Sequence, residues 1–256
     1  KTSSSSFSDS KRLPLKIRSK ILLLLAAAAI VSAGLASWIG YSIARNALES
    51  QSFDKLTAVR ELKANQVENY FEQIQNQLVT FSEDQMVVQA MGEFSDSFFS
   101  LSEELDANGV VHDDVDLELN LYYQREFVPS LEARLGSQIP KADYWPASRD
   151  ARLSQHIYIA QNPFDTGSKH LLDDPGDESR YSQAHREYHP LFRNFLERFG
   201  YYDIFLIDIK TGQIVYSVYK EMDFGTSLMN GPYRDTNLKT AFEAARIADL
   251  NTFCRL

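Results

Sequence analysis

Hydrophobic residues follow three different patterns along the chain, and each pattern predicts a different kind of element. No charged residue occurs from Ile21 to Ala44, a run long enough to cross a hydrocarbon core of about 30 Å as a helix. After this run, apolar residues recur every three or four positions, as on one face of a helix. Towards the C-terminal end they alternate or run together and are rich in Ile, Val, Tyr and Phe, which favours strands.

The second pattern predicts one long helix over residues 45–91. No proline occurs between Lys16 and Pro129, and no glycine between Gly40 and Gly92, so the local sequence gives no reason for a break. At the helical rise this rod is about 70 Å long. Its apolar stripe comprises Leu56, Val59, Val67, Tyr70, Ile74, Leu78 and Phe81. Such a rod can transmit a displacement from the membrane, although packing on the domain that follows also explains the stripe.

The middle of the chain mixes polar loops and short helices. Residues 103–118 are acidic and favour a loop. The segment Leu119–Leu135 favours a helix that Pro129 bends or restarts. After a second acidic loop, Arg180–Phe199 is predicted as a helix with Gly200 as its C-cap residue.

A β-hairpin is predicted near the C-terminal end. Tyr202–Asp208 and Ile214–Tyr219 are its strands, and Gly212 supplies a turn residue that tolerates positive φ. A helix is expected at Asn237–Ala248, and Thr252–Leu256 is expected to begin another strand. Because a two-stranded sheet is not stable alone, we expect the sheet to be incomplete within this chain.

The charge distribution orients the chain in a membrane. The first 44 residues carry six Lys or Arg against one Asp, a net charge of +5. Because the whole chain has a net charge of −9, the remaining residues carry −14. Five of the basic residues lie between Lys11 and Lys20, which places the N-terminus in the cytoplasm and the acidic remainder outside. Trp38 and Tyr41 suit the interface at the far end. An acidic domain repels phosphate backbones, so we expect no nucleic-acid partner.

A cleaved signal peptide is the alternative to a permanent membrane helix. Its apolar region would be Ile21–Val31, and Gly34-Leu35-Ala36 would be the cleavage site. The uncharged run is long for that purpose and continues past the site. Sequencing the mature N-terminus separates the two. The lone cysteine, Cys254, excludes an internal disulfide and any CxxC metal motif.

Four segments together resemble the double Cache family, which comprises paired PAS-like sensor domains outside the membrane in bacterial receptors. VENYFEQIQNQLVTFSEDQMVVQAM (Val67–Met91) resembles the long N-terminal helix of that family. YIAQNPF (Tyr158–Phe164) and YHPLFRNFLERFGYYDIFLID (Tyr188–Asp208) are similar to the lead-in of its distal domain. TGQIVYSVYKEMDFGTSLMNGPYRDTNL (Thr211–Leu238) is similar to the first hairpin and following loop.

The resemblance implies an α+β fold in which a transmembrane helix runs into a rod and then into a PAS-like domain with an antiparallel sheet, incomplete at the C-terminus. The expected parts are a basic cytoplasmic tail, a transmembrane helix, the rod, a helical lead-in and the truncated distal domain, at 1–20, 21–44, 45–91, 92–200 and 201–256. It further implies a homodimeric sensor in the inner membrane, with its sensor domain in the periplasm or outside the cell.

Such a sensor passes solute binding through the rod to a cytoplasmic output module outside this chain. A nucleotide cyclase or histidine kinase is favoured slightly over a chemotaxis module. The full-length protein can then be an enzyme for which this region is the regulatory half. A secreted or periplasmic solute-binding protein is the alternative from another class.

Two groups of residues raise the question of a metal. His185 and His189 share a helical face at i, i+4, but Arg186 stands where a zinc-protease motif has Glu, and no third ligand is evident. We therefore expect surface or capping histidines. The acidic runs 113–116 and 173–178 offer hard oxygens for calcium but lack EF-hand spacing. We expect solvated loops, with no metal and no cofactor.

A small-ligand pocket is the better hypothesis for chemistry. No nucleophile elbow, P-loop or dinucleotide fingerprint occurs in the sequence, so we expect no catalytic site in this region. Phenols and carboxylates around the hairpin can bind an amine, an amino acid or another small solute, although alternate hairpin residues also face a core. The candidate residues are Tyr201, Tyr202, Asp203, Tyr216, Asp223, Tyr233 and Asp235.

Overall fold

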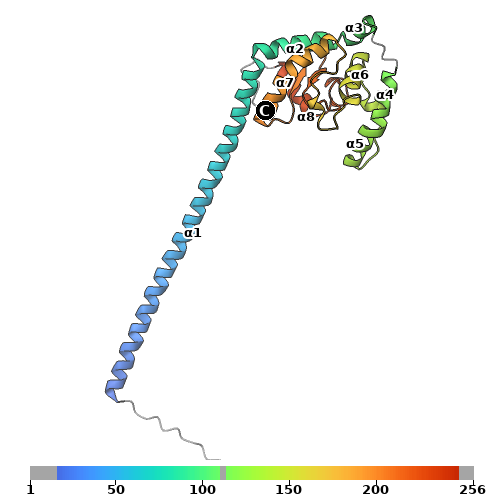
Figure 1. The fold of residues 1–256 in the computed structure, drawn as a ribbon. Coiled ribbons are helices and arrows are strands. Elements are labelled where there is room, and N and C mark those ends of the chain that lie inside the picture. Colours follow the sequence, from blue (N-terminus) through green and yellow to red (C-terminus); the bar gives the residue numbers. More distant parts are fainter. Residues whose placement is uncertain (1–15, 110–113, 248–256) are drawn as a thin grey trace, which may run out of the picture. The chain divides into compact units, whose positions relative to one another are not determined.

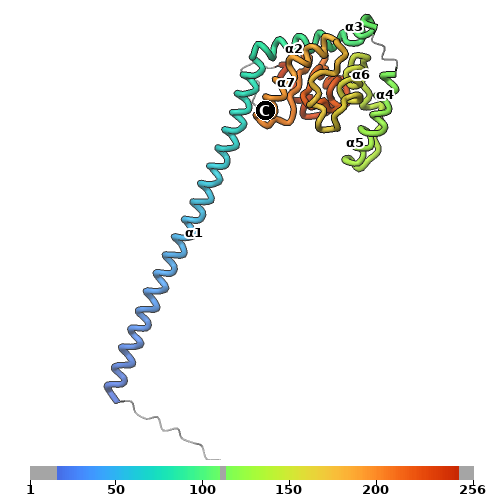
Figure 2. The backbone as a smooth tube through the Cα atoms, in the orientation of Figure 1, coloured from blue at the N-terminus to red at the C-terminus, as the bar shows by residue number. Residues whose placement is uncertain are grey.

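The computed structural model describes residues 16–109 and 114–247. The chain divides into two units, residues 1–73 and residues 74–256, and each is described by itself. Over these described residues the structure is mostly helical with one small antiparallel sheet (Figures 1 and 2). The start of the basic tail and the strand expected at Thr252–Leu256 lie outside the described residues.

The first unit consists of most of helix α1 (Ile17–Ser82), which joins the uncharged run and the rod without a break. This confirms the predicted continuity between them. Among the described residues, it is the one helix long and apolar enough to cross a membrane. Large apolar side chains point outward along it: Leu22 is 67% exposed, Ile30 72% and Trp38 74%.

The rod ends earlier than predicted. Helix α1 stops at Ser82, and α2 (Gln85–Phe98) begins after two intervening residues. The carboxylate of Asp84 accepts a hydrogen bond from the Met86 N–H at 2.8 Å, which is N-capping geometry. An aspartate cap starts a new helix here without proline or glycine, and this is why the prediction of one helix to residue 91 was wrong.

The acidic segment 103–118 was predicted as a loop, and this was wrong at both ends of the segment. It contains most of α3 (Leu101–Ala107) and the first half of α4 (Val115–Tyr122). Each helix buries apolar residues between its acids: Leu101 and Leu105 in α3, and Val115 and Leu119 in α4. The acids mark the solvent face of amphipathic helices rather than a loop.

Helix α4 leads into a π-helical turn, η1 (Tyr123–Phe127), and then into α5 (Val128–Leu135), which ends at Gly136 with φ of 67°. The prediction of a helix from residue 119 to 135, altered near its proline, is confirmed. The further helical elements are η2 (Lys141–Tyr144), α6 (Arg149–Gln155), η3 (His156–Ala160), η4 (Lys169–Leu171), α7 (Arg180–Phe199) and α8 (Asn237–Ile247). Helix α7 and its Gly200 cap agree with the prediction, with Gly200 at φ of 72°.

The hairpin is also confirmed. Strands β1 (Phe205–Ile207) and β2 (Ile214–Ser217) pair antiparallel, with Phe205 opposite Ser217 and Ile207 opposite Ile214. Gly212 turns the chain at φ of 67°, and a Cβ atom there would lie 2.7 Å from the side chain of Met229. Both the backbone conformation and the lack of space therefore require glycine.

An aromatic core joins helices α2 and α7 to strand β2, and the two helices lie side by side in Figure 1. The ring of Phe94 on α2 lies 4.5 Å from Tyr216 on β2 and 5.3 Å from Tyr181 on α7. Phe192 lies 5.2 Å from Tyr216 and 5.6 Å from Phe81 in the last turn of α1. This core fixes the end of β2, from which the chain continues into the wall of a cavity.

Candidate functional site

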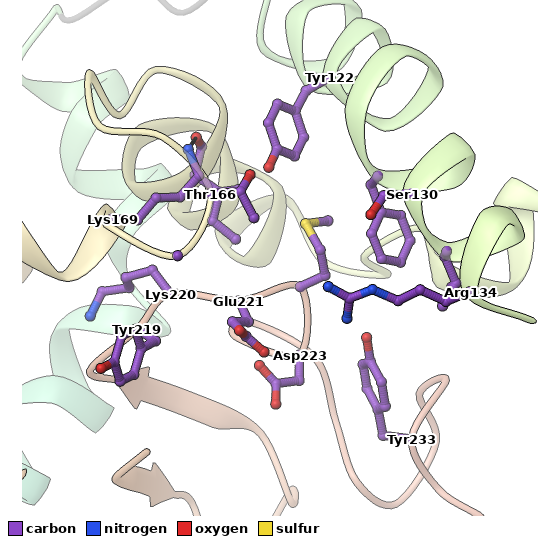
Figure 3. Close-up of a pocket in the computed structure, with 15 residues that line it drawn as sticks. Tyr122, Ser130, Arg134, Thr166, Lys169, Tyr219, Lys220, Glu221, Asp223 and Tyr233 are labelled. Carbon is purple, nitrogen blue, oxygen red and sulfur yellow. Dashed lines mark hydrogen bonds between the residues drawn. The ribbon is translucent and has the colours of Figure 1, made fainter. Parts of the chain in front are cut away.

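A cavity of about 240 Å³ lies in the second unit. Its walls come from the segment α4–η1–α5, from the loop after η3, and from the chain after β2 (Figure 3). Rings, hydroxyls and charged groups line it together: Tyr122, Phe127, Ser130, Leu131, Arg134, Ile159, Thr166, Gly167, Lys169, Tyr219, Lys220, Glu221, Met222, Asp223 and Tyr233. Pockets for drug-sized ligands hold roughly 300–1,000 Å³, so this cavity suits a smaller solute.

Two π-helical turns contribute side chains to the walls of this cavity. The turn η1 contributes Phe127 and η3 contributes Ile159. In η1, the Val128 N–H reaches the carbonyl of Tyr123, five residues earlier, and Pro129 follows with no N–H to donate. Single π turns inside α-helices are frequently found at functional sites. Their presence on two walls supports a site here.

The chain after β2 is held by the buried side chain of Lys220. Its backbone has φ of 55°, in the left-handed region that non-glycine residues rarely adopt. Its ammonium donates to the carbonyl of Ser217 and lies 4.1 Å from the ring centre of Tyr216, 5.2 Å from Phe224 and 5.6 Å from Tyr158. Burial lowers the pKa of this lysine well below its usual value.

A buried glutamine fixes the same segment from the opposite side. The side-chain amide of Gln155, at the end of α6, donates to the carbonyl of Met222 at 3.3 Å and to that of Phe224 at 2.7 Å. Its oxygen lies 2.8 Å from the hydroxyl of Tyr123 in η1. Because Gln155 is fully buried, breaking this set would leave unpaired polar groups in the interior. Asp223, between the two bonded carbonyls, is therefore held in place.

Asp223 is the unusual charged group of the cavity. Burial first, and then the neighbouring carboxylates of Asp203 and Glu221, raise its pKa to about 7. Its Oδ1 atom is buried and has no hydrogen-bond partner among the described residues. The carboxylates of Glu221 and Asp223 lie beside each other in Figure 3, with the hydroxyl of Tyr233 near them. A buried carboxylate oxygen without a donor is costly unless a donor is supplied.

The other buried charge at the cavity, Lys169, already has its partners. Its ammonium donates to the carbonyls of Ile159 at 2.7 Å and Phe164 at 3.2 Å, and lies 5.5 Å from the ring centre of Tyr122. Burial lowers its pKa. Arg134, by contrast, is an exposed residue of α5, and its guanidinium extends from α5 towards Tyr233, Glu221 and Asp223 (Figure 3).

Of the seven residues predicted to bind ligand, the structure brings Asp223 and Tyr233 to the cavity. The other five, Tyr201, Tyr202, Asp203, Tyr216 and Asp235, do not line it. Asp203 is structural, because its carboxylate accepts the N–H groups of Ile204, Val218 and Tyr219 at 2.7, 2.9 and 3.3 Å.

Tyr216 is fully buried in the aromatic core, where its hydroxyl lies 2.7 Å from His189 Nδ1. Tyr201 pairs with Gln77 at 2.7 Å. Tyr202 is 80% exposed, and Asp235 forms an exposed ion pair with Arg234. The alternation of a hairpin predicts that some of its residues face inward, but it does not say whether a cavity or a packed core lies there.

Sequence reasoning missed the residues that come from the middle of the chain, notably Tyr122, Arg134, Thr166 and Lys169. They lie on α4, on α5, in the loop before η4 and at the first position of η4. No local pattern relates them to the hairpin, because only tertiary packing brings these segments together. Pro129 was the one local signal, since a proline inside a helical pattern marks the irregular turn beside the cavity.

The two histidines of α7 were predicted to lie at the surface or in caps, and this was wrong. His185 and His189 are fully buried, with stacked rings whose centres are 4.2 Å apart. Burial first, and then Lys220, lower the pKa of His189 to about 2. Both are core residues: His185 Nδ1 lies 2.9 Å from the Asp173 carbonyl and His189 Nε2 lies 2.7 Å from that of His170.

Within residues 16–109 and 114–247, no three His, Cys, Asp or Glu side chains are grouped to hold a metal ion. The acidic loop at 173–178 uses its carboxylates locally: Asp173 pairs with Arg193 and Asp174 with Arg186, each at 2.7 Å. Asp113, in the other acidic run, lies outside the described residues.

The raised pKa of Asp223 has a measurable consequence for stability. The folded carboxyl takes up a proton as the pH falls through about 7, whereas the unfolded one does so near 3.8. Between these values the folded state binds more protons, so its stability rises as the pH falls. Relative to Asp223→Asn, the wild type should gain up to about 1.4 kcal/mol per pH unit from pH 7 towards pH 4.

Urea unfolding of the full chain in detergent, followed by near-ultraviolet circular dichroism at fixed pH, measures this difference. Asp235→Asn is the matched control, because that carboxylate is 88% exposed and its profile should parallel the wild type. A parallel profile for Asp223→Asn as well would show that Asp223 ionises like an exposed carboxylate.

Comparisons with known proteins identify no relative of this chain. No family model matches the chain, and no curated protein or solved structure is similar to it. The double Cache resemblance therefore rests on the four sequence segments alone.

Proposed function

We propose that this chain is the solute-sensing input region of a transmembrane signal transducer. The cavity carries the proposal: it is small, lies against two π-helical turns, and contains a carboxylate oxygen with no donor among the described residues. Pockets that combine apolar walls with a few converging polar groups are the usual sites for small ligands. Solute binding there would shift the balance between two arrangements of the second unit.

Helix α1 supports the membrane part of the proposal. Its uncharged stretch exposes nearly all of its large apolar side chains, whereas a core helix of a soluble protein would bury them. A hydrocarbon surrounding accounts for this exposure. With the basic residues before Ile21, we propose a cytoplasmic N-terminus and a second unit in the periplasm or outside the cell.

The finer parts of the proposal follow the family resemblance. The hairpin β1–β2, followed by the loop and α8, is consistent with the start of a PAS-like Cache domain. A cyclase or histidine kinase output is favoured over chemotaxis. A secreted or periplasmic solute-binding protein with a cleaved signal peptide is the alternative, and it is distinguished by whether the uncharged run persists in the mature protein.

Ligand binding in the cavity is tested by thermal unfolding of the full chain in detergent against a panel of amines, amino acids, organic acids, sugars and nucleobases. A ligand at 100 times its Kd stabilises by about 2.7 kcal/mol, which for a domain of this size raises Tm by roughly 5–10 °C.

Ser130→Trp, which places a large ring at the cavity wall, should abolish the shift without lowering the Tm of the free protein, because Ser130 is exposed. A panel in which no solute raises Tm, or a shift that persists in Ser130→Trp, would contradict solute binding in this cavity.

Membrane orientation is tested by cysteine labelling. Cys254→Ser gives a cysteine-free background, to which Ser10→Cys or Asp165→Cys is added. Asp165 is exposed. In intact cells, a membrane-impermeant maleimide should label Asp165→Cys and label Ser10→Cys only after lysis. The reverse result, or a mature protein found in the soluble fraction, would contradict the proposed orientation.

We also propose that the rod pairs with a second copy of the chain. In the first unit, Leu48, Val59 and Tyr70 are spaced by eleven residues, as are Leu56 and Val67. All five are more than half exposed, from 53% to 66%. An eleven-residue repeat has 3.67 residues per turn, close to the 3.6 of a straight helix, and favours a slight right-handed supercoil. Two anchored copies can therefore pack nearly straight rods along this stripe.

Single cysteines in the cysteine-free background test this pairing. Leu56→Cys and Val67→Cys should form disulfide-linked dimers on mild oxidation, because they lie on the eleven-residue stripe. Their neighbours Lys55→Cys and Gln66→Cys, which a seven-residue repeat would place in the seam, should cross-link much less. Stronger cross-linking at residues 55 and 66 would indicate a left-handed coil, and none at any position would contradict a rod dimer.

A further inference from the structure

Some charged groups around the cavity already have hydrogen-bond partners within the protein, whereas one buried carboxylate oxygen has none among the described residues. Lys169 and Lys220 are both buried, and each ammonium donates to backbone carbonyls. The Lys220 side chain, moreover, packs among the aromatic rings of the core. Each amine is therefore already engaged by protein groups, and among the described residues neither forms an ion pair with Glu221 or Asp223.

The acidic side of the cavity is not satisfied in this way. Asp223 faces the cavity with Glu221 beside it (Figure 3). Among residues 16–109 and 114–247, no cationic side chain forms an ion pair with either carboxylate, and Asp223 Oδ1 accepts no hydrogen bond. Arg134 is an exposed residue whose guanidinium extends towards this side of the cavity in Figure 3, where water and salt weaken its charge, and it forms no ion pair with Asp223. This side of the cavity therefore contains one buried acceptor without a donor among the described residues, Asp223 Oδ1, with the exposed carboxylate of Glu221 beside it.

The remaining walls also suit a cation that carries N–H groups. The hydroxyls of Tyr122 and Tyr233 face the cavity in Figure 3 and can accept hydrogen bonds, and the ring of Phe127 lines it. Aromatic faces attract cations. A quaternary ammonium would bring charge but no N–H for the unpaired carboxylate oxygen, whereas a primary ammonium brings three donors.

We infer that the cavity recognises a small primary ammonium compound, with Asp223 as the main acceptor and the neighbouring phenols completing the site. This inference rests on the proposed solute-binding function and narrows it to one chemical class. The cavity volume of about 240 Å³ limits the ligand to a compact amine. Anionic solutes would meet the two carboxylates and should be excluded.

Isothermal titration calorimetry of the full chain in detergent, at pH 8 so that Asp223 is ionised, tests this with four probes of similar size. n-Butylamine should bind, whereas 1-butanol, butyrate and tetramethylammonium should bind at least tenfold more weakly. Asp223→Asn keeps the shape of the side chain and removes its charge, and should weaken n-butylamine binding roughly tenfold or more, as expected for a hydrogen bond to a charged group.

The controls separate this inference from the proposed function. Asp235→Asn removes an exposed charge from the loop that follows Asp223, and it should change the affinity for n-butylamine by less than about twofold. Circular dichroism shows whether Asp223→Asn is folded. If Asp223→Asn is folded and binds n-butylamine as the wild type does, the assignment to Asp223 is overturned.

If butyrate or 1-butanol binds as well as n-butylamine and Ser130→Trp abolishes that binding, the cavity binds solutes without selecting ammonium. The inference then fails and the proposed function stands. If none of the four probes binds, while a non-amine of the solute panel raises Tm, the ammonium inference again fails and the proposed function stands. If no solute of any class binds, both fail.

Discussion

Lys220 packs its side chain among three aromatic rings, and the position of the cavity's acidic wall depends on this contact. A lysine ammonium removed from water has to find acceptors or aromatic faces. Here the Ser217 carbonyl and the rings of Tyr216, Phe224 and Tyr158 provide them. The side chain reaches this environment only because its backbone adopts positive φ. That conformation turns the chain after β2, so that Glu221 and Asp223 line the cavity rather than continue a strand.

The walls formed by η1 and η3 depend on irregular helix. In η1 and η3 the chain makes π-helical turns, and each places one apolar side chain in the cavity. Gln155, at the junction of α6 and η3, ties these walls to the carbonyls of Met222 and Phe224. The cavity is thus held open by buried polar contacts, which specify geometry more narrowly than apolar packing because each broken bond leaves an unsatisfied group. A ligand that changes the position of Asp223 would act directly on these contacts.

The two units present the same helical periodicity in different surroundings. In the last turn of α1, Phe81 packs on Phe192 and Phe195 of α7 and is part of a core. In the first unit, equivalent positions such as Val59 and Tyr70 remain exposed. Exposed apolar side chains in a regular repeat are a cost in water, and a second identical helix is the simplest surface that removes it. The proposed pair of nearly straight rods would be suited to sliding or rotating as a unit, as the proposed signalling through a membrane helix requires.

The sequence by itself determined the features that depend on neighbouring residues. The uncharged run, the continuous helix after it, helix α7 with its Gly200 cap, and the hairpin around Gly212 all follow from local periodicity and backbone preference. Tertiary structure alone decided which polar residues are desolvated. It buried His185 and Tyr216 in a core, left Tyr202 in solvent, and brought Asp223 together with Tyr122 and Arg134 from helices distant in the chain. Desolvation is set by contacts between segments far apart in sequence, and no local spacing of residues encodes it.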